Sequence, residues 1–278
     1  MAQFRTRFAP SPTGHLHLGH AASAFHVWKA AEEVGGDVIL RIEDIDQTRC
    51  RPEFETAIYE DLDWLGLQWT GEVRRQSDHY GDYSKILETL AARGLVYRCF
   101  RTRKEVLAEI DRAPHGATAA FVSEPLSNTE ETARIQSGEA FAWRLSLSRA
   151  REVLGSAYET LGFEEQHKGW HKADPCTFGD VVLARKDTPT SYHLATTHDD
   201  ALQAITHIIR GDDLFPSTSV HVLLQALMGW STPAYHHHDL LLDDMGKRFA
   251  KRDKSRTLRA MRSEGLTADE VRKLAGVE

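Results

Sequence analysis

The sequence lacks the features that mark membrane, secreted and disulfide-rich proteins. No apolar run approaches the roughly 18 residues that a membrane-spanning helix needs. The N-terminal stretch MAQFRTRFAP has no apolar core of the kind found in signal peptides, so nothing indicates secretion. The three cysteines, Cys50, Cys99 and Cys176, lie far apart, and so sparse and odd a set is not typical of a disulfide framework. These absences predict a cytoplasmic protein, because the cytoplasm keeps thiols reduced.

An excess of basic charge is also missing. The 278 residues carry a formal net charge of -7 with a pI near 6.1, which argues mildly against a protein that coats nucleic acid. Basic residues are nevertheless concentrated in residues 246–262, GKRFAKRDKSRTLRAMR, which form either a solvated surface or a local site for phosphates. A hydrophobic content of 41% and a charged content of 27% are those of an ordinary globular protein.

The N-terminal residues predict a βαβ unit. Alternation and two phenylalanines in QFRTRFA predict a strand over residues 3–9, which Pro10 and Pro12 end. Apolar residues then recur at spacings of three and four over residues 18–34, which predicts a helix. The continuous apolar run at residues 38–40 is typical of a buried parallel strand. In such sheets ligands bind at the carboxyl ends of the strands.

Two histidines stand at the predicted start of this helix. His17 and His20 are three positions apart, so their side chains share one helix face. A helix N-terminus offers N–H groups and the positive end of the helix dipole, which is where phosphates bind. Two imidazoles there can stabilise the charge that builds up during displacement at phosphorus. The alternatives are capping or core histidines, and a metal site with His15, which no nearby Cys or acidic residue supports at a usual zinc spacing.

Four motifs in order carry a resemblance to a known family. The stretch PSPTGHLHLGH, residues 10–20, resembles the adenylate-binding signature of class I aminoacyl-tRNA synthetases, and RIEDID, residues 41–46, is similar to the glutamyl branch. The resemblance continues through TPTSYHLATTHDDALQAITHIIRGDDLF, residues 188–215, and LLLDDMGKRFAKRD, residues 240–253. It implies an α/β fold of the Rossmann-type nucleotide-binding class, with an inserted α/β lobe and short C-terminal helices.

The resemblance also implies an organisation along the chain. Residues 1–98 and 178–255 are expected to form the two halves of the catalytic fold. Residues 99–177 are expected to form the inserted lobe, and residues 256–278 the C-terminal helices.

The amino-acid site follows from the chemistry of glutamate, which has two carboxylates and one ammonium. Arginine suits a carboxylate because its fork donates two parallel hydrogen bonds. Glu43 can accept from the ammonium, and the phenol of Tyr192 can donate to a carboxylate. By resemblance, the glutamate-contacting positions are Arg7, Ala9, Ser11, Glu43, Tyr192 and Arg210. Which arginine binds which carboxylate stays open.

The resemblance places ATP at His17, Gly19 and His20, together with a lysine of the second signature. RFAKR, residues 248–252, matches the glutamyl form of that signature, in which Lys-Leu-Ser-Lys-Arg is usual, so Lys251 is the expected phosphate-contacting lysine. KRDKS, residues 251–255, leaves Lys254 as the alternative, and Ala250 replaces the usual serine. The expected catalytic residues are His17, His20 and Lys251, with Mg²⁺ accompanying ATP.

No structural zinc is expected. Members of the family often hold zinc with a Cys-x-Cys pair near YRCFRTR. Here Cys99 matches the first ligand, Arg101 occupies the second, and residues 102–140 offer only His115. One thiolate and one imidazole do not complete a tetrahedral site.

Two further stretches receive no place in the site. Asp44 and Asp46 can bind a divalent cation, but their more common role is to cap a following helix, here one with Pro52 in its first turn. The histidines at 236–238 are expected to precede a strand, where they either contact ATP or have a structural role.

The chain resembles a shortened branch of the family, the glutamyl-queuosine tRNA(Asp) synthetases. Only 23 residues follow Ser255, room for one or two helices but not for the anticodon-binding region of full-length relatives. The implied partners are L-glutamate, ATP and the anticodon loop of tRNA(Asp), whose queuosine base receives the glutamyl group. Ordinary glutamylation of a tRNA 3′ end and a silent tRNA- or protein-binding relic are the alternatives. The presence of His17, His20 and Lys251 together argues against the relic, and the oligomeric state is not predicted.

Overall fold

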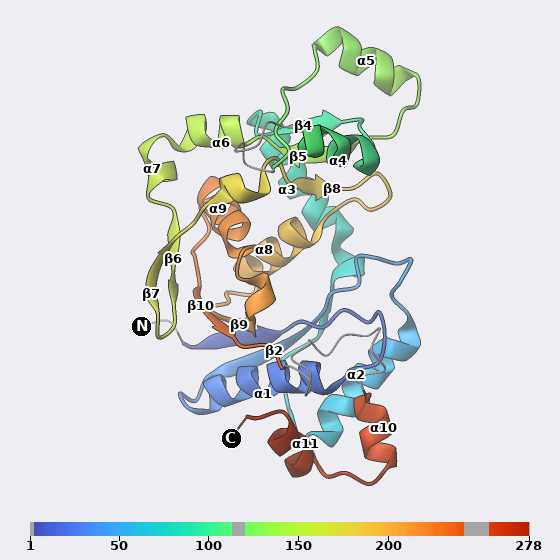
Figure 1. The fold of residues 1–278 in the computed structure, drawn as a ribbon, viewed down its shortest axis with the longest axis vertical. Helices are drawn as coiled ribbons and strands as arrows, with labels where there is room; N and C mark the ends of the chain where they lie inside the picture. The colour runs from blue at the N-terminus through green and yellow to red at the C-terminus, as the bar shows by residue number, and fades with distance from the viewer. Residues whose placement is uncertain (1–2, 113–119, 242–255, 278) are drawn as a thin grey trace.

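The structure, a computed structural model, describes residues 3–112, 120–241 and 256–277 (Figure 1). Lys251, Lys254, Ala250 and His115 therefore lie outside the described residues. No helix in the described part of the chain is long and apolar enough to cross a membrane.

Two sheets of mainly parallel strands meet near the middle of the molecule. The first has the order β1-β2-β3, and the second has the order β7-β6-β10-β9, in which only β7 is antiparallel to its neighbour. The strands are β1 (Arg5–Phe8), β2 (Asp37–Ile42), β3 (Arg74–Arg75), β6 (Gly162–Glu165), β7 (Gly169–Lys172), β9 (His207–Gly211) and β10 (Ala234–His238).

The two sheets are joined at the amino ends of β1 and β9. The N–H of Thr206 donates to the carbonyl of Arg5 (2.9 Å), and the N–H of Arg5 donates to the hydroxyl of Thr206 (2.9 Å). Beyond this link the two strands form no ladder, so they part toward their carboxyl ends. The chain leaves β1 toward β2 and leaves β9 toward β10, in opposite directions, and such a switch point is where open α/β sheets bind ligands.

Helices cover both faces of the sheets (Figure 1). The helix α1 (Leu18–Glu32) packs against β1, β2 and β9 on one face, and α8 (Tyr192–Leu202) and α9 (Thr218–Met228) lie on the other. Ile39 belongs to the core with α8 and α9, whereas its neighbour Leu40 belongs to the core with α1. Burial on both faces explains the continuous apolar run of β2, and each such side chain contributes about 1.5–3 kcal/mol.

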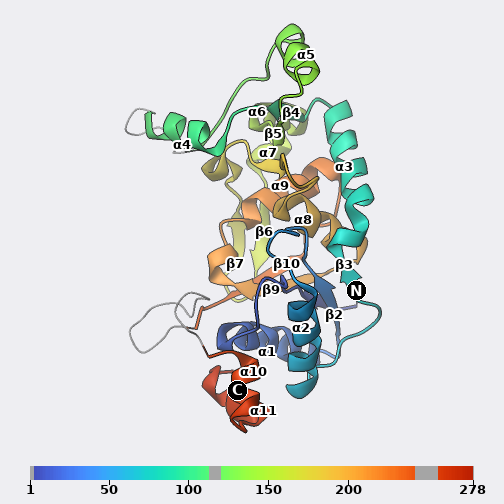
Figure 2. The ribbon, with the colours of Figure 1, turned by 90° about the vertical axis from the view of Figure 1, so that its right-hand side faces the viewer.

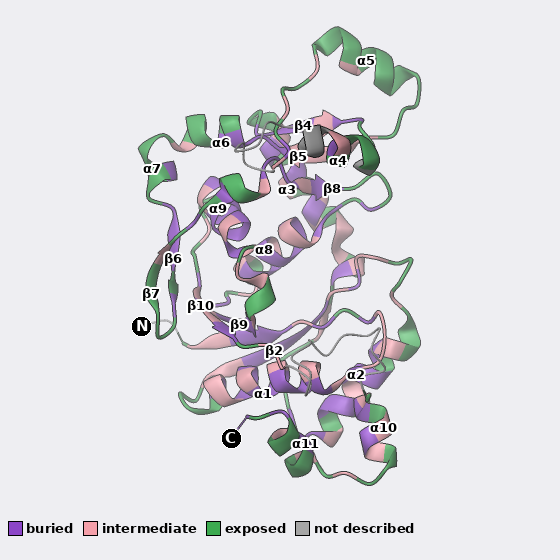
Figure 3. Ribbon diagram, viewed as in Figure 1, coloured by how far each residue is buried: buried purple, intermediate pink, exposed green. Residues whose placement is uncertain are grey.

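A third sheet, which is antiparallel, forms the lobe at the far end of the molecule. It contains β4 (Val96–Cys99), β5 (Ala142–Leu145) and β8 (Val182–Ala184). The helices α4 (Arg103–Arg112) and α5 (Asn128–Gln136) project from it, away from the C-terminal helices (Figure 2). Figure 3 shows that α5 buries none of its residues, in contrast to β1 and β2 of the main sheets.

The remaining helices connect these layers. They are α2 (Pro52–Trp64), α3 (Tyr80–Ala92), α6 (Leu147–Leu154), α7 (Ser156–Glu159), α10 (Leu258–Ser263), α11 (Ala268–Leu274) and the short 3-10 helices η1 (Gln76–His79), η2 (Pro175–Phe178) and η3 (Asp212–Leu214). The C-terminal pair packs on the outer helices, α10 on α2 and α11 on α1. The N–H of Leu258 donates to the carbonyl of Leu16 (2.9 Å), so α10 begins beside the loop that precedes α1.

Strand pairing crosses the boundaries of the predicted segments. The strand β6 falls within residues 99–177, yet it pairs with β10 of the later segment. The lobe sheet takes β4 from the end of the first segment and β8 from the third. The sheets are thus built from strands of more than one predicted segment. The division of the chain into four segments stays a prediction.

The predicted βαβ unit is confirmed, with elements slightly shorter than the sequence pattern. The predicted strand over residues 3–9 is β1, the predicted helix over residues 18–34 is α1, and residues 38–40 lie in β2. Gly36 follows α1 where a Cβ atom would lie 2.8 Å from the carbonyl oxygen of Phe4, so only glycine fits this close approach.

Two local predictions are wrong. The carboxylate of Asp44 accepts from the backbone N–H and hydroxyl of Ser77, and that of Asp46 accepts from Arg49 within a turn, so neither caps α2. Pro52 does stand in the first turn of α2. The histidines at 236–238 do not precede a strand but end β10, in register with residues 209–211 of β9. Because two of the three are buried in place of apolar residues, an apolar pattern does not reveal this strand.

A buried carboxylate between α2 and α10 generates a prediction about stability. Asp61 is 0% exposed, and neither of its carboxylate oxygens has a hydrogen-bond partner among the described residues. Its ion-pair partner, Arg262, lies 3.9 Å away. Burial raises the pKa of Asp61 to about 6, above the value of about 4 expected in the unfolded chain. The folded protein therefore binds the proton more tightly, and its stability falls as the pH rises from about 4 to above 6.

We predict that Asp61→Asn raises the free energy of unfolding at pH 8 by about 1–3 kcal/mol, because it removes the buried charge. Urea unfolding at pH 4 and at pH 8 measures the free energy of unfolding. The difference in this free energy between Asp61→Asn and wild type should be smaller at pH 4. Asp63→Asn, an exposed position of the same helix, is the control. A less stable Asp61→Asn variant at pH 8 would show that the charge of Asp61 stabilises the fold.

Candidate active site

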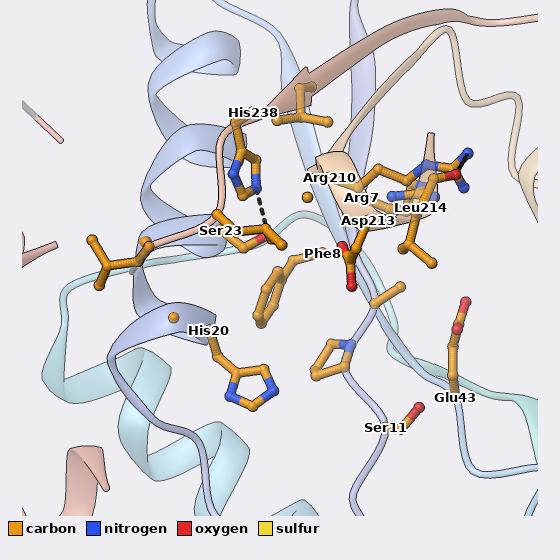
Figure 4. A pocket seen from close by; sticks show the side chains of 18 of the residues that line it. Arg7, Phe8, Ser11, His20, Ser23, Glu43, Arg210, Asp213, Leu214 and His238 are labelled. Carbon is orange, nitrogen blue, oxygen red and sulfur yellow. Dashed lines mark hydrogen bonds between the residues drawn. The ribbon is translucent and has the colours of Figure 1, made fainter. Parts of the chain in front are cut away.

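A pocket of about 430 Å³ opens where β1 and β9 part (Figure 4). Its lining includes each predicted site residue that the structure describes, namely Arg7, Ala9, Ser11, His17, Gly19, His20, Glu43, Tyr192 and Arg210. They come from the end of β1, the loop before α1 and its first turn, the end of β2, the start of α8 and the end of β9. The structure thus brings together residues far apart in the sequence, while Lys251 lies outside the described residues.

Arg210 is a buried cation surrounded by neutral acceptors. Its side chain is on β9 and the residue is 4% exposed. Its Nε donates to Nε2 of His237 (3.1 Å), and its Nη2 donates to the hydroxyl of Thr218 (2.6 Å) and the carbonyl of Leu214 (3.2 Å). Its Nη1 donates to the hydroxyl of Tyr192 (3.3 Å). Among the described residues Arg210 forms no ion pair, and a buried cation without one suits a ligand with a negative charge.

The histidines around Arg210 are neutral at pH 7. Burial, followed by the charge of Arg210, lowers the pKa of His193 to about 4 and that of His221 well below its usual range. Nδ1 of His221 lies 3.4 Å from Nη1 of Arg210, and Nδ1 of His193 lies 3.3 Å from Nε2 of His221. These rings contribute hydrogen bonds without adding a second positive charge.

Arg7 is buried like Arg210, but it forms an ion pair with a carboxylate of the protein. Its Nε donates to Oδ1 of Asp200 (3.0 Å), which also lies 2.9 Å from Nη2 of Arg41. Arg41 in turn lies 3.2 Å from Glu43. Arg41 and Asp200 were not predicted as site residues. The available signal for Arg41 was a charged residue inside the apolar strand β2. The two supporting residues hold Arg7 and Glu43 in place from behind the pocket.

Glu43 provides an acidic acceptor at this end of the pocket. Burial raises the pKa of Glu43, while the neighbouring Arg41 and Arg7 act in the opposite direction. The hydroxyl of Thr196 donates to its Oε1 (2.9 Å). The lining therefore presents two arginines, Arg7 and Arg210, and two carboxyl groups, Glu43 and Asp213. Arginines suit the two carboxylates of glutamate, and a carboxyl group suits its ammonium.

His17 and His20 cap α1 and face the other end of the pocket. The N–H of Gly19 donates to Nδ1 of His17 (3.2 Å), and the N–H of His17 donates to Nδ1 of His20 (3.1 Å). The two ring centroids are 3.9 Å apart. Because Nδ1 accepts in both rings, each neutral ring carries its proton on Nε2. Capping, which the sequence left as an alternative, is thus compatible with donation from Nε2 to a phosphate.

Ser23 and His238 also line the pocket and were not predicted as site residues. His238 Nε2 lies 3.1 Å from the hydroxyl of Ser23 on α1, as the dashed line in Figure 4 shows. Two of the three histidines at 236–238 therefore lie in different surroundings. His238 lines the pocket, whereas His237 is buried behind Arg210.

Cys99 lies in a small apolar core with Tyr97, Val106 and Phe121. Within the part of the chain that the structure describes, no three His, Cys, Asp or Glu side chains form a group that could hold a metal ion. His115 lies outside the described residues, so the expected absence of structural zinc stays a prediction.

Comparison with known proteins places this geometry in a family. The description "tRNA synthetases class I (E and Q), catalytic domain" matches residues 3–272. The chain belongs to this family. Its fold class, predicted from four motifs, is thereby confirmed, and the family implies the use of ATP.

The family members most relevant here fall into two groups. The chain is 45% identical to the "Glutamyl-Q tRNA(Asp) synthetase" of Rhodobacter capsulatus, over 98% of this chain and 99% of that protein. It is 35% identical to the "Glutamate--tRNA ligase" of Aquifex aeolicus, over 95% of this chain but 55% of that protein. Among solved structures, a glutamate tRNA ligase from Elizabethkingia meningosepticum in complex with its amino acid superposes with a TM-score of 0.75 at 29% identity. That match covers 95% of this chain and 54% of the ligase, so this chain spans about half the length of such ligases.

Proposed function

We propose that this chain activates L-glutamate with ATP, without tRNA, and then transfers the glutamyl group to queuosine in the anticodon loop of tRNA(Asp). The observation that carries the first step is the pocket lining. Arg210, a buried cation without a carboxylate partner among the described residues, shares one cavity with Arg7, Glu43 and the histidine-bearing start of α1.

In the proposed complex, Arg7 and Arg210 bind the two carboxylates of glutamate, and Glu43 accepts from its ammonium. Tyr192 donates to a carboxylate, while Ala9 and Ser11 complete the wall of the pocket. The buried surroundings strengthen each of these charge-assisted hydrogen bonds relative to water. Arg41 and Asp200 keep Arg7 and Glu43 in position.

The first step is displacement at the α-phosphorus of ATP. A carboxylate oxygen of glutamate forms the new P–O bond, the bond to pyrophosphate breaks, and glutamyl-adenylate results. His17 and His20 donate from Nε2 to phosphate oxygens. The ammonium of Lys251 stabilises the negative charge that develops as pyrophosphate leaves. Mg²⁺ is expected to travel with the ATP phosphates. No covalent intermediate with the protein is needed, because positioning and charge stabilisation supply the catalysis.

The second step is acyl transfer to RNA. A ring hydroxyl of queuosine attacks the carbonyl carbon of the adenylate, the acyl–oxygen bond to AMP breaks, and a glutamyl ester remains on the base. An anticodon loop is single-stranded, so its bases can turn outward into a compact catalytic domain. Support for this acceptor comes from the relative in Rhodobacter capsulatus, which the chain matches over 99% of that protein. Glutamate–tRNA ligases, which it matches over about half their length, make charging of a 3′ end the alternative.

We predict that His17→Ala, His17→Asn and Lys251→Ala each lower adenylate formation by at least about tenfold, because each removes one transition-state donor. Glutamate-dependent ATP–pyrophosphate exchange measures this. His17→Asn keeps a good N-cap for α1, so its melting temperature should stay close to that of wild type.

Lys254→Ala is the matched control for the second signature and should remain within about threefold of wild type. If Lys254→Ala is severely impaired and Lys251→Ala is mild, the assignment of the phosphate-contacting lysine is wrong.

The acceptor is tested with labelled glutamate and tRNA(Asp) that has or lacks queuosine. We predict that label appears only on the queuosine-bearing tRNA, and that nuclease mapping finds it in the anticodon loop. Periodate does not distinguish the sites, because it oxidises the diols of both queuosine and the 3′-terminal ribose. Label on the 3′-terminal adenosine of tRNA(Glu) contradicts the proposed acceptor and supports ordinary charging.

A further inference from the structure

A buried carboxylate lies behind Arg210, outside the pocket. Glu165 is the last residue of β6 and is 1% exposed. Its Oε1 accepts from the backbone N–H of His237, and its Oε2 lies 2.7 Å from Nδ1 of the same residue. Neither Glu165 nor His237 is among the residues that line the pocket. A buried carboxylate with both oxygens committed to one histidine fixes the state of that histidine.

Glu165 is ionised at neutral pH. Burial acts to raise the pKa of Glu165, but the hydrogen bonds from the backbone and the ring of His237 outweigh it and lower the pKa. An ionised carboxylate only accepts hydrogen bonds, so Nδ1 of His237 must carry a proton.

His237 is neutral and therefore has a single tautomer. Burial, followed by the charge of Arg210, lowers the pKa of His237 to about 4. With its one ring proton on Nδ1, the ring presents a lone pair at Nε2. That is the atom to which Nε of Arg210 donates at 3.1 Å. The side chains form a directed chain of hydrogen bonds from Arg210 through His237 to Glu165.

Aromatic rings hold the plane of His237. The ring of Tyr235 is nearly parallel to it, with centroids 5.8 Å apart and 2° between the planes, and Phe215 packs edge-on at 4.9 Å. The imidazole therefore cannot turn easily to offer its other nitrogen. If the proton moved to Nε2, two N–H donors would face each other, and the guanidinium of Arg210 would have to rotate away.

The orientation of Arg210 decides which of its donors reach the pocket. His237 holds Nε, while Thr218 and Leu214 hold Nη2, so the Nη1 edge lies beside Tyr192. Figure 4 shows Arg210 and Arg7 on the side of the pocket away from His20. A small rotation of the Arg210 guanidinium changes its alignment with a substrate carboxylate. Two parallel hydrogen bonds between the two groups depend on that alignment.

We propose that Glu165 is a positioning residue for amino-acid binding, which acts through His237 to hold the guanidinium of Arg210 in the orientation that binds a substrate carboxylate. This proposal rests on the proposed function, because it takes the ligand of Arg210 to be a carboxylate of glutamate. Glu165 itself contacts no substrate. It acts from β6, a strand that contributes no residue to the lining of the pocket.

The test is Glu165→Gln, which keeps the size of the side chain but removes the charge that selects the tautomer of His237. In glutamate-dependent ATP–pyrophosphate exchange, the KM for glutamate should rise by at least about tenfold. The kcat at saturating glutamate and the KM for ATP should change by less than about threefold, because Arg210 acts on the amino acid alone. Glu164→Gln, the same substitution at the exposed neighbouring residue, should match wild type.

A double variant separates positioning from a general loss of packing. Because Glu165 acts through His237, Glu165→Gln should add less than about twofold to the KM for glutamate in a His237→Leu background. An unchanged KM in Glu165→Gln, a rise in both KM values with a fall in kcat, or additive effects in the double variant would each overturn the proposal. A wild-type protein without glutamate-dependent exchange contradicts the proposed function itself and overturns this proposal with it.

Discussion

Placing a guanidinium in the interior without a carboxylate beside it is the constraint on which the pocket depends. Arg210 is buried at the end of β9, and its partners among the described residues are hydroxyls, a carbonyl oxygen and neutral imidazoles. Such an arrangement is costly unless a negative charge arrives from outside. Arg7, across the gap between the strands, is already paired with Asp200. The two arginines are thus unlike each other, and the unpaired one is the stronger argument for an anionic ligand.

The separation of β1 and β9 opens the pocket that the guanidinium of Arg210 lines. The strands are joined at their amino ends through Thr206 and separate toward their carboxyl ends, where the pocket opens. The loop after β1 leads directly into α1, so the same opening receives His17 and His20 at a helix N-terminus. One end of the cavity suits carboxylates and the other suits phosphates. The proposed reaction, attack of a carboxylate on the α-phosphorus of ATP, requires both within a single site.

The sequence predicted the parts of the fold and site that depend on local pattern. The apolar spacing of α1, the two-sided burial of β2 and the pairing of His17 with His20 at a helix start all follow from short-range rules. Arg41 could have been noticed as a charged residue within an apolar strand, but its pairing with Asp200 could not, because a buried ion pair joins residues distant in sequence and leaves no periodic signal. The contact between Glu165 and His237 was not predicted for the same reason. The strand β10 was not predicted, because histidines occupy its buried positions 237 and 238, where apolar residues are expected.

We propose that Arg7 and Arg210 together select an amino acid with two carboxylates, and exchange with glutamate and with glutamine distinguishes whether they do. Glutamine has nearly the same shape and lacks one of the two carboxylate charges. In ATP–pyrophosphate exchange without tRNA, we expect a kcat/KM at least about 100-fold higher for glutamate than for glutamine, because a buried charge-assisted pair is lost with glutamine. Equal exchange with glutamine, or no exchange with either amino acid, would contradict it.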